Sequence, residues 1–252
     1  MALPLSVAII ASNEEKSIGR CLRSVNDLAS EIIVVVNDCK DKTVEIVKAF
    51  NGKVYEETWH GFSHQKNLAI GYTSQPWILC LDADEEVDGE LHDSIVSFIK
   101  ANDHSCCGAY FSTRTFFIDR WIKHGDWNPD YNLRLFRKKH GSWSNDRVHE
   151  KLNVSGPIRK LEGHLLHYSF ENIEDFMKKN MKYAELFEFK EEKSIFVILL
   201  RSCWRFVRGY FFKLGFLDGL PGFYIAYAQA FFTMYKHMRI LIKNRTLRGN
   251  VS

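Results

Sequence analysis

Two kinds of segment alternate over the first hundred residues. Short apolar, β-branched runs predict strands at Leu5–Ala11, Glu31–Asn37, Lys53–Thr58 and Trp77–Leu81. Amphipathic segments between and after them predict helices at Glu14–Leu28, Lys42–Phe50, Ser63–Gly71 and Gly89–Ala101. This alternation is typical of βαβ units and predicts an α/β protein with a mostly parallel sheet. In such a sheet, ligands bind beyond the carboxyl ends of the strands.

The pattern changes after Ala101. Aromatic-rich runs at Gly108–Ile118 and Tyr131–Arg137 predict strands, and the loops around them are rich in Gly, Asn, Asp and Trp. We interpret this part as an antiparallel extension of the sheet that covers the first half and shapes a second pocket. A polar helix is predicted over Ile173–Glu192.

The end of the chain carries a different charge from the rest. Residues 1–193 hold 25 Lys and Arg against 30 Asp and Glu, whereas residues 194–252 hold nine Lys and Arg and one acid, Asp218. Ser194–Tyr235 contains thirteen aromatic residues, and its longest uncharged run, Gly219–Tyr235, is shorter than the roughly 18–20 residues that span a bilayer. We predict a monotopic helical segment on an anionic membrane surface, with a helical cap carrying snorkelling cations as the alternative.

Composition and charge narrow the class of protein. A chain of 252 residues with 46% hydrophobic and 26% charged residues has the balance of a folded globular protein, which excludes wholesale disorder. The six cysteines show no metal-type spacing, and the amino-terminus lacks a secretory signal, so we expect the catalytic part in the cytoplasm. Nucleic acid is not an expected partner, because the basic residues of the tail alternate with bulky apolar groups.

Two carboxylates follow the fourth predicted strand, in the run Leu79–Glu86. Asp82 and Asp84 are hard oxygen ligands at the sheet edge, suited to Mg²⁺ or Mn²⁺ with open positions for phosphate oxygens. Such acids also serve as simple helix caps. The chain has no Walker motif and no Gly-x-Gly-x-x-Gly after its first strand, which argues against an NTPase or a dinucleotide enzyme.

Other polar clusters follow the earlier strands. Their position at successive strand ends favours a shared binding site over simple helix capping by Asp82 and Asp84. Ser12, Asn13 and Glu14 follow the first strand and suit a helix start. Asp38 follows the second strand, where its carboxylate could accept from a base N–H, and Lys66 offers a cation for a phosphate.

Together these residues resemble the GT-A nucleotide-sugar domain of family 2 inverting glycosyltransferases, in particular bacterial lipopolysaccharide core β-1,4-glucosyltransferases that act on heptose. The matching segments are Asn13-Glu14-Glu15, Asp38 with Thr43, Gly61–Ala69, Asp82-Ala83-Asp84, Arg134–Arg137, Gly141-Ser142-Trp143 and Val148-His149-Glu150. The resemblance implies a GT-A domain over residues 1–193, with a nucleotide-sugar half at 1–101, an acceptor half at 102–193 and a membrane-associating segment at 194–252.

The resemblance also implies roles for the strand-end residues. Asp38 would contact uracil of a UDP-sugar, and Ser12, Asn13 and Glu14 would complete the uridine pocket. Asp82 would lie near the ribose and the metal, Asp84 would ligate the metal, and Lys66 would contact the diphosphate.

Inverting transfer needs a base for the acceptor hydroxyl. We assign it to Glu150, with Asp146 in reserve; the alternative is a surface ion pair of Glu150. His167 is a candidate third metal ligand or a structural histidine. Strand alternation predicts that at most one of Arg134 and Arg137 faces the pocket.

Two aromatic residues have open roles. Trp127 and Trp143 either stack on sugar rings or anchor buried loops.

The expected function is transfer of a hexose, glucose by the resemblance, from a UDP-hexose to a lipid-anchored lipopolysaccharide inner core at the cytoplasmic face of the bacterial inner membrane. The metal would be Mg²⁺ or Mn²⁺. Two alternatives remain open: transfer to a polyprenyl-linked or capsule precursor, and a non-catalytic membrane-bound nucleotide-sugar binder.

Overall fold

A computed structural model describes residues 3–144, 151–170, 172–186 and 193–249. The chain divides into two compact units, each considered by itself below. The first comprises residues 1–113 and 130–167, and the second comprises residues 114–129 and 168–252. The functional boundary expected between residues 193 and 194 stays a prediction.

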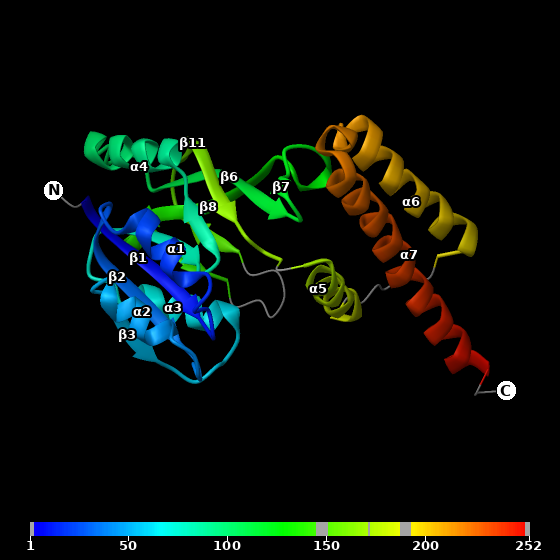
Figure 1. Cartoon of the computed structure of the whole chain (residues 1–252), viewed down its shortest axis with the longest axis horizontal. Coiled ribbons are helices and arrows are strands. Elements are labelled where there is room, and N and C mark those ends of the chain that lie inside the picture. The colour runs from blue at the N-terminus through cyan, green and yellow to red at the C-terminus, as the bar shows by residue number, and fades with distance from the viewer. Residues whose placement is uncertain (1–2, 145–150, 171, 187–192, 250–252) are drawn as a thin grey trace. The chain divides into compact units, whose positions relative to one another are not determined.

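The first unit is built around parallel strands in the order β3-β2-β1-β4 (Figure 1). Their bounds are β1 Leu3–Ala11, β2 Ala29–Val36, β3 Lys53–Glu56 and β4 Trp77–Asp82. All four agree with the predicted runs within a few residues. Their carboxyl ends meet at one edge of the sheet, where the polar clusters of the sequence lie.

The sheet continues past β4 in the order β8-β6-β11-β5. The bounds of these strands are β8 Asp130–Arg137, β6 Gly108–Phe117, β11 Ile158–His167 and β5 Glu85–Val87. Strand β8 is antiparallel to both β4 and β6, and β5 is antiparallel to β11. The predicted antiparallel extension is therefore confirmed. A separate hairpin pairs β9 (Gly141–Trp143) with β10 (Leu152–Val154).

Both faces of the parallel strands are covered because their side chains alternate. Ile9 and Leu79 belong to one apolar cluster and Ala8 and Ile78 to another. The first cluster takes in helices α1 (Ile18–Val25), α2 (Thr43–Ala49) and α4 (Gly89–Ala101), and the second takes in α3 (Phe62–Tyr72) and the β9–β10 hairpin.

Helix α1 begins at Ile18, four residues later than the sequence pattern predicts. The backbone N–H of Glu14 donates to the Thr43 hydroxyl at 2.7 Å, and that of Glu15 donates to Asp41 at 2.9 Å. Because the loop after β2 and the first residue of α2 take up these donors, the segment forms a turn joined to them.

One buried carboxylate joins three parts of this unit. Glu31 on β2 accepts from the Ser6 hydroxyl at 2.6 Å and the Ser74 N–H at 2.7 Å, and it pairs with Lys53 at 2.9 Å. Burial acts to raise the pKa of Glu31, but these hydrogen bonds outweigh it and lower the pKa to about 2. The charged form therefore stabilises the fold.

We expect Glu31→Gln to cost up to about 3 kcal/mol of unfolding free energy at neutral pH. Since the folded pKa is lowered, this stabilisation is present above the unfolded pKa near 4.5 and is lost as the pH falls toward 2. Urea unfolding between pH 7 and pH 3 measures it, with exposed Glu56→Gln on β3 as the matched control. A difference between wild type and Glu31→Gln that does not shrink in acid would contradict the assignment.

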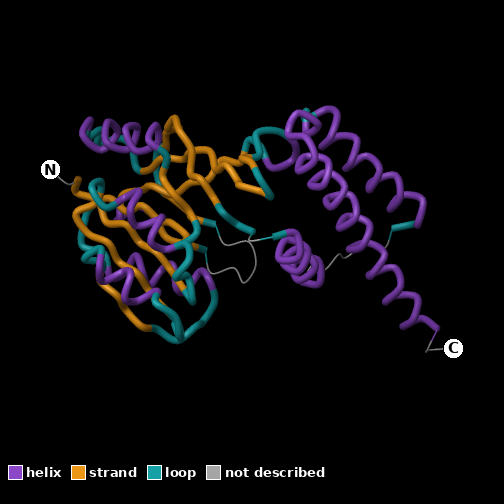
Figure 2. Tube along the Cα trace, viewed as in Figure 1, coloured by secondary structure: helices purple, strands orange, loops and turns teal. Residues whose placement is uncertain are grey.

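The second unit is mainly helical, as the purple tubes of Figure 2 show. Its helices are α5 (Ile173–Leu186), α6 (Ile195–Val207) and α7 (Gly219–Gly249). Helix α5 begins at its predicted residue, while 187–192 lie outside the described residues. Apolar side chains that include Phe117, Phe176 and Phe232 form its core. Over the described residues, no helix combines the length and apolarity needed to cross a membrane.

Candidate functional site

Three carboxylates lie at the end of β4. Asp82 is the last residue of β4, and Glu85 begins β5 two residues after Ala83. Glu85 is buried at 1% exposure and accepts the Asp82 N–H at 2.7 Å, which fixes the turn between the strands. Asp84 lies within this turn, and its side chain keeps 29% of its surface exposed. The turn thus buries one acid and presents another.

Two cations neutralise the buried side of this cluster. Lys66 from α3 places Nζ 2.9 Å from Asp82 Oδ1. Arg134 from β8 places Nη2 3.1 Å from Asp82 Oδ2 and 2.7 Å from Glu85 Oε1. The Trp143 ring lies 4.5 Å from the Lys66 ammonium and 5.8 Å from the Arg134 guanidinium. The aromatic face stabilises both cations beneath the sheet edge.

The pKa values of Asp82 and Glu85 are shifted in opposite directions. Burial acts to raise the pKa of Asp82, but Lys66 and Arg134 hold it well below its usual range. Burial raises the pKa of Glu85, and Arg134 only partly opposes this. Asp82 is therefore a stable carboxylate acceptor at the sheet edge.

Sheet pairing brings a histidine to the same edge. Strand β11 runs antiparallel to β5 and sets His167 opposite Glu85. His167 Nε2 consequently lies 3.3 Å from Asp84 Oδ2. Burial acts to lower the pKa of His167, whereas its bond to Asp84 raises it. Asp84 and His167 are thus neighbours, although 83 positions separate them in the sequence.

A divalent metal fits this pair better than it fits Asp82. Asp84 and His167 offer one oxygen and one nitrogen donor, both partly accessible. Both oxygens of Asp82 already contact cations. No group of three or more His, Cys, Asp or Glu suited to a metal occurs in the part of the chain that the structure describes. Phosphate oxygens and water would complete the shell, as Mg²⁺ usually requires. The metal role expected for Asp82 stays a prediction.

The candidate nucleotide residues lie at the ends of β1 and β2. The Ser12 hydroxyl donates to the Asn37 carbonyl at 3.0 Å. Asn13 accepts the Lys40 N–H at 2.8 Å, and the Glu14 carboxylate accepts the Ser17 hydroxyl at 2.5 Å. The two loops are therefore joined to each other beside the sheet edge.

Asp38 extends from this pair of loops into solvent. Its side chain is 73% exposed and lies 3.3 Å from the Lys40 ammonium. Asp38 and Asn13 both have positive φ, 45° and 57°, a conformation that Asp and Asn tolerate better than most residues. An exposed acceptor on a constrained loop suits the proposed contact with a base, which stays a prediction.

The remaining candidates divide into three groups. Glu150 and Asp146 lie outside the described residues. Arg137 lies over the Trp77 ring at 4.4 Å and donates to the Cys106 carbonyl at 3.0 Å, so it points away from the acid cluster while Arg134 points into it, as strand alternation predicts.

The two tryptophans serve as anchors. Trp143 is 8% exposed and exchanges hydrogen bonds with Asn67, whose amide contacts both its backbone N–H and its carbonyl. Trp127 packs against the core of the second unit.

Glu85 is a site residue that sequence reasoning missed. It follows Asp84 directly, so the acidic run hides the difference between a presented carboxylate and a buried one. The signal that could have found it is the alternation of β5: Glu85 and Val87 face inward while Glu86 pairs with Arg20 at 3.6 Å.

We expect Arg134→Met to lower the unfolding free energy by about 3 kcal/mol, because it leaves Glu85 buried without its cation. Arg137→Met on the same strand should cost about 1 kcal/mol, since no buried acid loses a partner. Chemical denaturation of both variants provides the comparison. Equal losses of unfolding free energy in the two variants would contradict a larger contribution from the buried pair of Arg134 and Glu85.

The chain is similar to several known proteins. A family model described as "Glycosyl transferase family 2" matches residues 6–154. An uncharacterised glycosyltransferase of Rickettsia typhi is 30% identical over 262 residues, which cover 96% of this chain and 89% of that protein. The lipopolysaccharide core biosynthesis glycosyltransferase LpsC of Rhizobium meliloti is 30% identical over 191 residues, covering 73% of this chain and 70% of its own.

A solved structure has the same fold. The crystal structure of S. aureus TarS superposes with a TM-score of 0.50 at 17% identity, over 87% of this chain and 46% of the other.

Proposed function

The chain belongs to glycosyltransferase family 2 and is a glycosyltransferase, and we propose that it transfers a hexose from a UDP-sugar to a lipid-anchored oligosaccharide. The observation that carries the proposal is the sheet edge where accessible Asp84 and His167 lie beside an Asp82 already neutralised by Lys66 and Arg134. A diphosphate needs positive charge and hard ligands, and this edge offers both.

The chain's own residues hold the donor. The joined loops after β1 and β2 present Ser12, Asn13, Glu14 and Asp38 toward a uridine, with Asp38 accepting from the base. Lys66 supplies a positive charge near the diphosphate. Its Nζ is held in place by Asp82, 2.9 Å away, so little reorganisation is needed when the phosphates arrive.

A divalent cation, Mg²⁺ or Mn²⁺, would be held by Asp84 and His167. When bound, it supplies positive charge to the diphosphate oxygens. His167 would hold the cation through a neutral Nε2, so the proton that its contact with Asp84 favours would have to be absent from that atom.

The reaction replaces one bond at the anomeric carbon by another. The acceptor hydroxyl oxygen attacks from the face opposite UDP, the bond from carbon to phosphate oxygen breaks, and UDP leaves with the electron pair. Glu150 takes the hydroxyl proton, with Asp146 as the reserve base. Attack from the opposite face inverts the configuration.

Two observations support the proposed acceptor. One relative of 30% identity is named for lipopolysaccharide core biosynthesis, and the sequence motifs resemble heptose glucosyltransferases. We therefore place glucose as the hexose and inner-core heptose as the acceptor, at the cytoplasmic face of the bacterial inner membrane, with the chain bound peripherally. The exposed apolar and basic surface of α6 favours such a membrane acceptor.

We expect Asp84→Asn to reduce UDP release from a UDP-hexose by about a hundredfold or more, because the diphosphate loses its metal-holding carboxylate. Glu86→Gln, two positions on, is the matched control, since Glu86 pairs with Arg20 instead. Release of UDP in the presence of Mn²⁺ is the assay. Full activity of Asp84→Asn would exclude the proposed metal site.

We expect Glu150→Gln to lower the rate of transfer by about 10² to 10⁴ while UDP binding is retained, because only proton removal is lost. Asp146→Asn is the comparison. Calorimetry measures UDP binding, and product formation measures transfer. If Asp146→Asn shows the larger loss, the two roles are exchanged.

A further inference from the structure

Three cations surround one buried carboxylate in the second unit. Asp126 belongs to the short helix η1 (Gly125–Trp127), and its side chain is 4% exposed. Its oxygens lie 3.0 Å from Arg205 Nε, 2.7 Å from Arg208 Nη2 and 3.2 Å from Lys213 Nζ. One negative charge therefore holds three positive charges together, and we call these four residues the Asp126 cluster.

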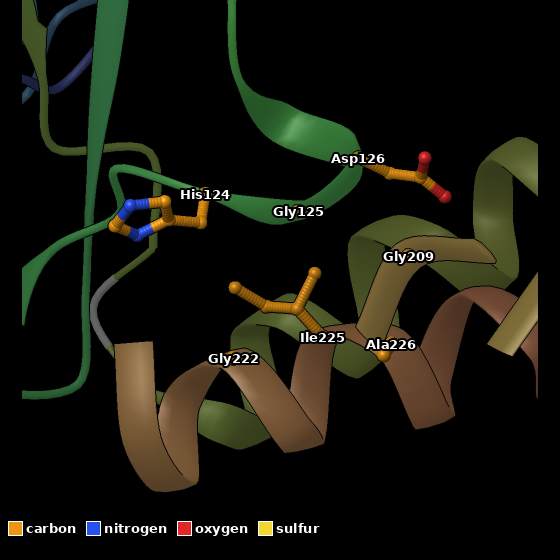
Figure 3. Close-up of a pocket in the computed structure, with 7 residues that line it drawn as sticks. All are labelled: His124, Gly125, Asp126, Gly209, Gly222, Ile225 and Ala226. Atoms are coloured by element: carbon orange, nitrogen blue, oxygen red, sulfur yellow. The ribbon is translucent and has the colours of Figure 1, made fainter. Parts of the chain in front are cut away.

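The backbone packs closely around the Asp126 cluster. The Gly125 N–H donates to the Lys213 carbonyl at 2.8 Å, and a Cβ at Gly209 would come within 3.3 Å of the Asp126 carboxylate. Figure 3 shows Asp126 projecting on the Gly209 side and away from His124. The adjoining cavity measures about 10 Å³, room for about one water. A ligand must therefore approach from outside.

The outer sides of the cations are accessible. The side chains of Arg205, Arg208 and Lys213 are 35%, 36% and 40% exposed. Their surplus of positive charge over Asp126 favours an anion with two or more oxygens, such as a phosphate.

A broad apolar surface adjoins the cluster on the same elements. Helix α6 exposes apolar side chains at helical spacing, and the connection η3 (Arg208–Phe212) to η4 (Gly215–Asp218) and the first turn of α7 continue them. Its exposed members include Ile195, Phe196, Leu199, Leu200, Trp204, Phe211, Phe212, Leu217 and Leu220. Leu220 reaches 75% exposure. Apolar exposure on this scale marks an interaction surface.

Residues 194–252, which form this surface, contain one acid. Asp218 is the single acid of residues 194–252, and it is buried. It accepts the backbone N–H groups of Lys123 and His124 at 3.0 and 2.7 Å and contacts the His124 ring at 3.0 Å. Over the described part of this segment, the surface therefore presents cations and apolar groups without a carboxylate.

We propose that the Asp126 cluster binds the phosphate of an anionic membrane phospholipid while the apolar side chains of α6, the η3–η4 connection and the first turn of α7 enter the acyl region of one leaflet. A free phosphate would use the cations alone, whereas a phospholipid uses the cations and the apolar surface together. The proposal rests on the membrane surface proposed above and adds the contacting elements and the lipid group they bind.

The pairing with Asp126 alters the role expected for the tail arginines. Arg205 and Arg208 hold a buried acid within the protein as well as facing outward, so neutralising them would also leave Asp126 unpaired. Lys213 is the better probe, because Asp126 keeps both arginines when the lysine is lost.

The test is flotation of the full chain with phosphatidylcholine vesicles, with and without phosphatidylglycerol, at low salt and without donor sugar. We expect binding to the anionic vesicles and an approximately fivefold loss of affinity in Lys213→Gln. Lys243→Gln is the matched control, because it removes the same charge about 36 Å along α7 from Gly219 and should change binding little.

The apolar contribution has its own pair of variants. Leu220→Gln should weaken flotation with anionic vesicles, whereas Tyr183→Gln on α5, 61% exposed, should not. UDP release from a soluble donor should be unaffected in Lys213→Gln. Loss of lipid binding and failure of the transferase activity are therefore measured separately.

Three results would overturn the proposal. Equal losses in Lys213→Gln and Lys243→Gln would mean diffuse charge attraction without a built site. Thermal stabilisation by inorganic phosphate that needs Lys213, without vesicle binding, would assign the cluster to a soluble phosphate. A dimer in light scattering that Leu220→Gln dissociates, again without vesicle binding, would assign the apolar surface to a second copy of the chain.

Discussion

The ion pairs that Lys66 and Arg134 make with Asp82 are the interaction on which the site depends. A sheet edge with three adjacent carboxylates would repel itself, and each acid would resist ionisation. Two cations fixed by α3 and β8 remove this repulsion, and Glu85 is buried beneath them. Because Asp82 and Glu85 pair with these two cations, Asp84 is presented beside His167.

This arrangement requires the mixed sheet. Parallel strands alone would bring Asp82 and the loops after β1 and β2 to one edge, but they could not supply Arg134 or His167. Antiparallel β8 brings the arginine beside β4, and β11 sets the histidine opposite β5. The antiparallel extension therefore completes a cluster that the parallel strands begin. The second unit repeats the principle in another form, because buried Asp126 organises three cations near an apolar surface.

Much of the fold follows from the sequence because its signals are local. Alternating apolar runs located β1 to β4, and the aromatic-rich runs located β6 and β8. The site was harder to predict where it depends on pairing between distant strands. Asp82 and Asp84 are visible as a motif, whereas their different partners follow from the three-dimensional position of Lys66, Arg134 and His167. Glu85 was missed because an acidic run does not reveal which member is buried. The late start of α1 was missed because it depends on distant partners. The N–H groups of Glu14 and Glu15 donate to residues that lie 29 and 26 positions further along the chain.

We propose that Asp84 and His167 together hold the metal that accompanies a nucleoside diphosphate. Electron spin-echo spectroscopy of Mn²⁺ bound in the presence of UDP tests it most directly, because an imidazole ligand adds nitrogen modulation to the signal. We expect this modulation in the wild type and its disappearance in His167→Ala. Bound Mn²⁺ with the same spectrum in both proteins would contradict it.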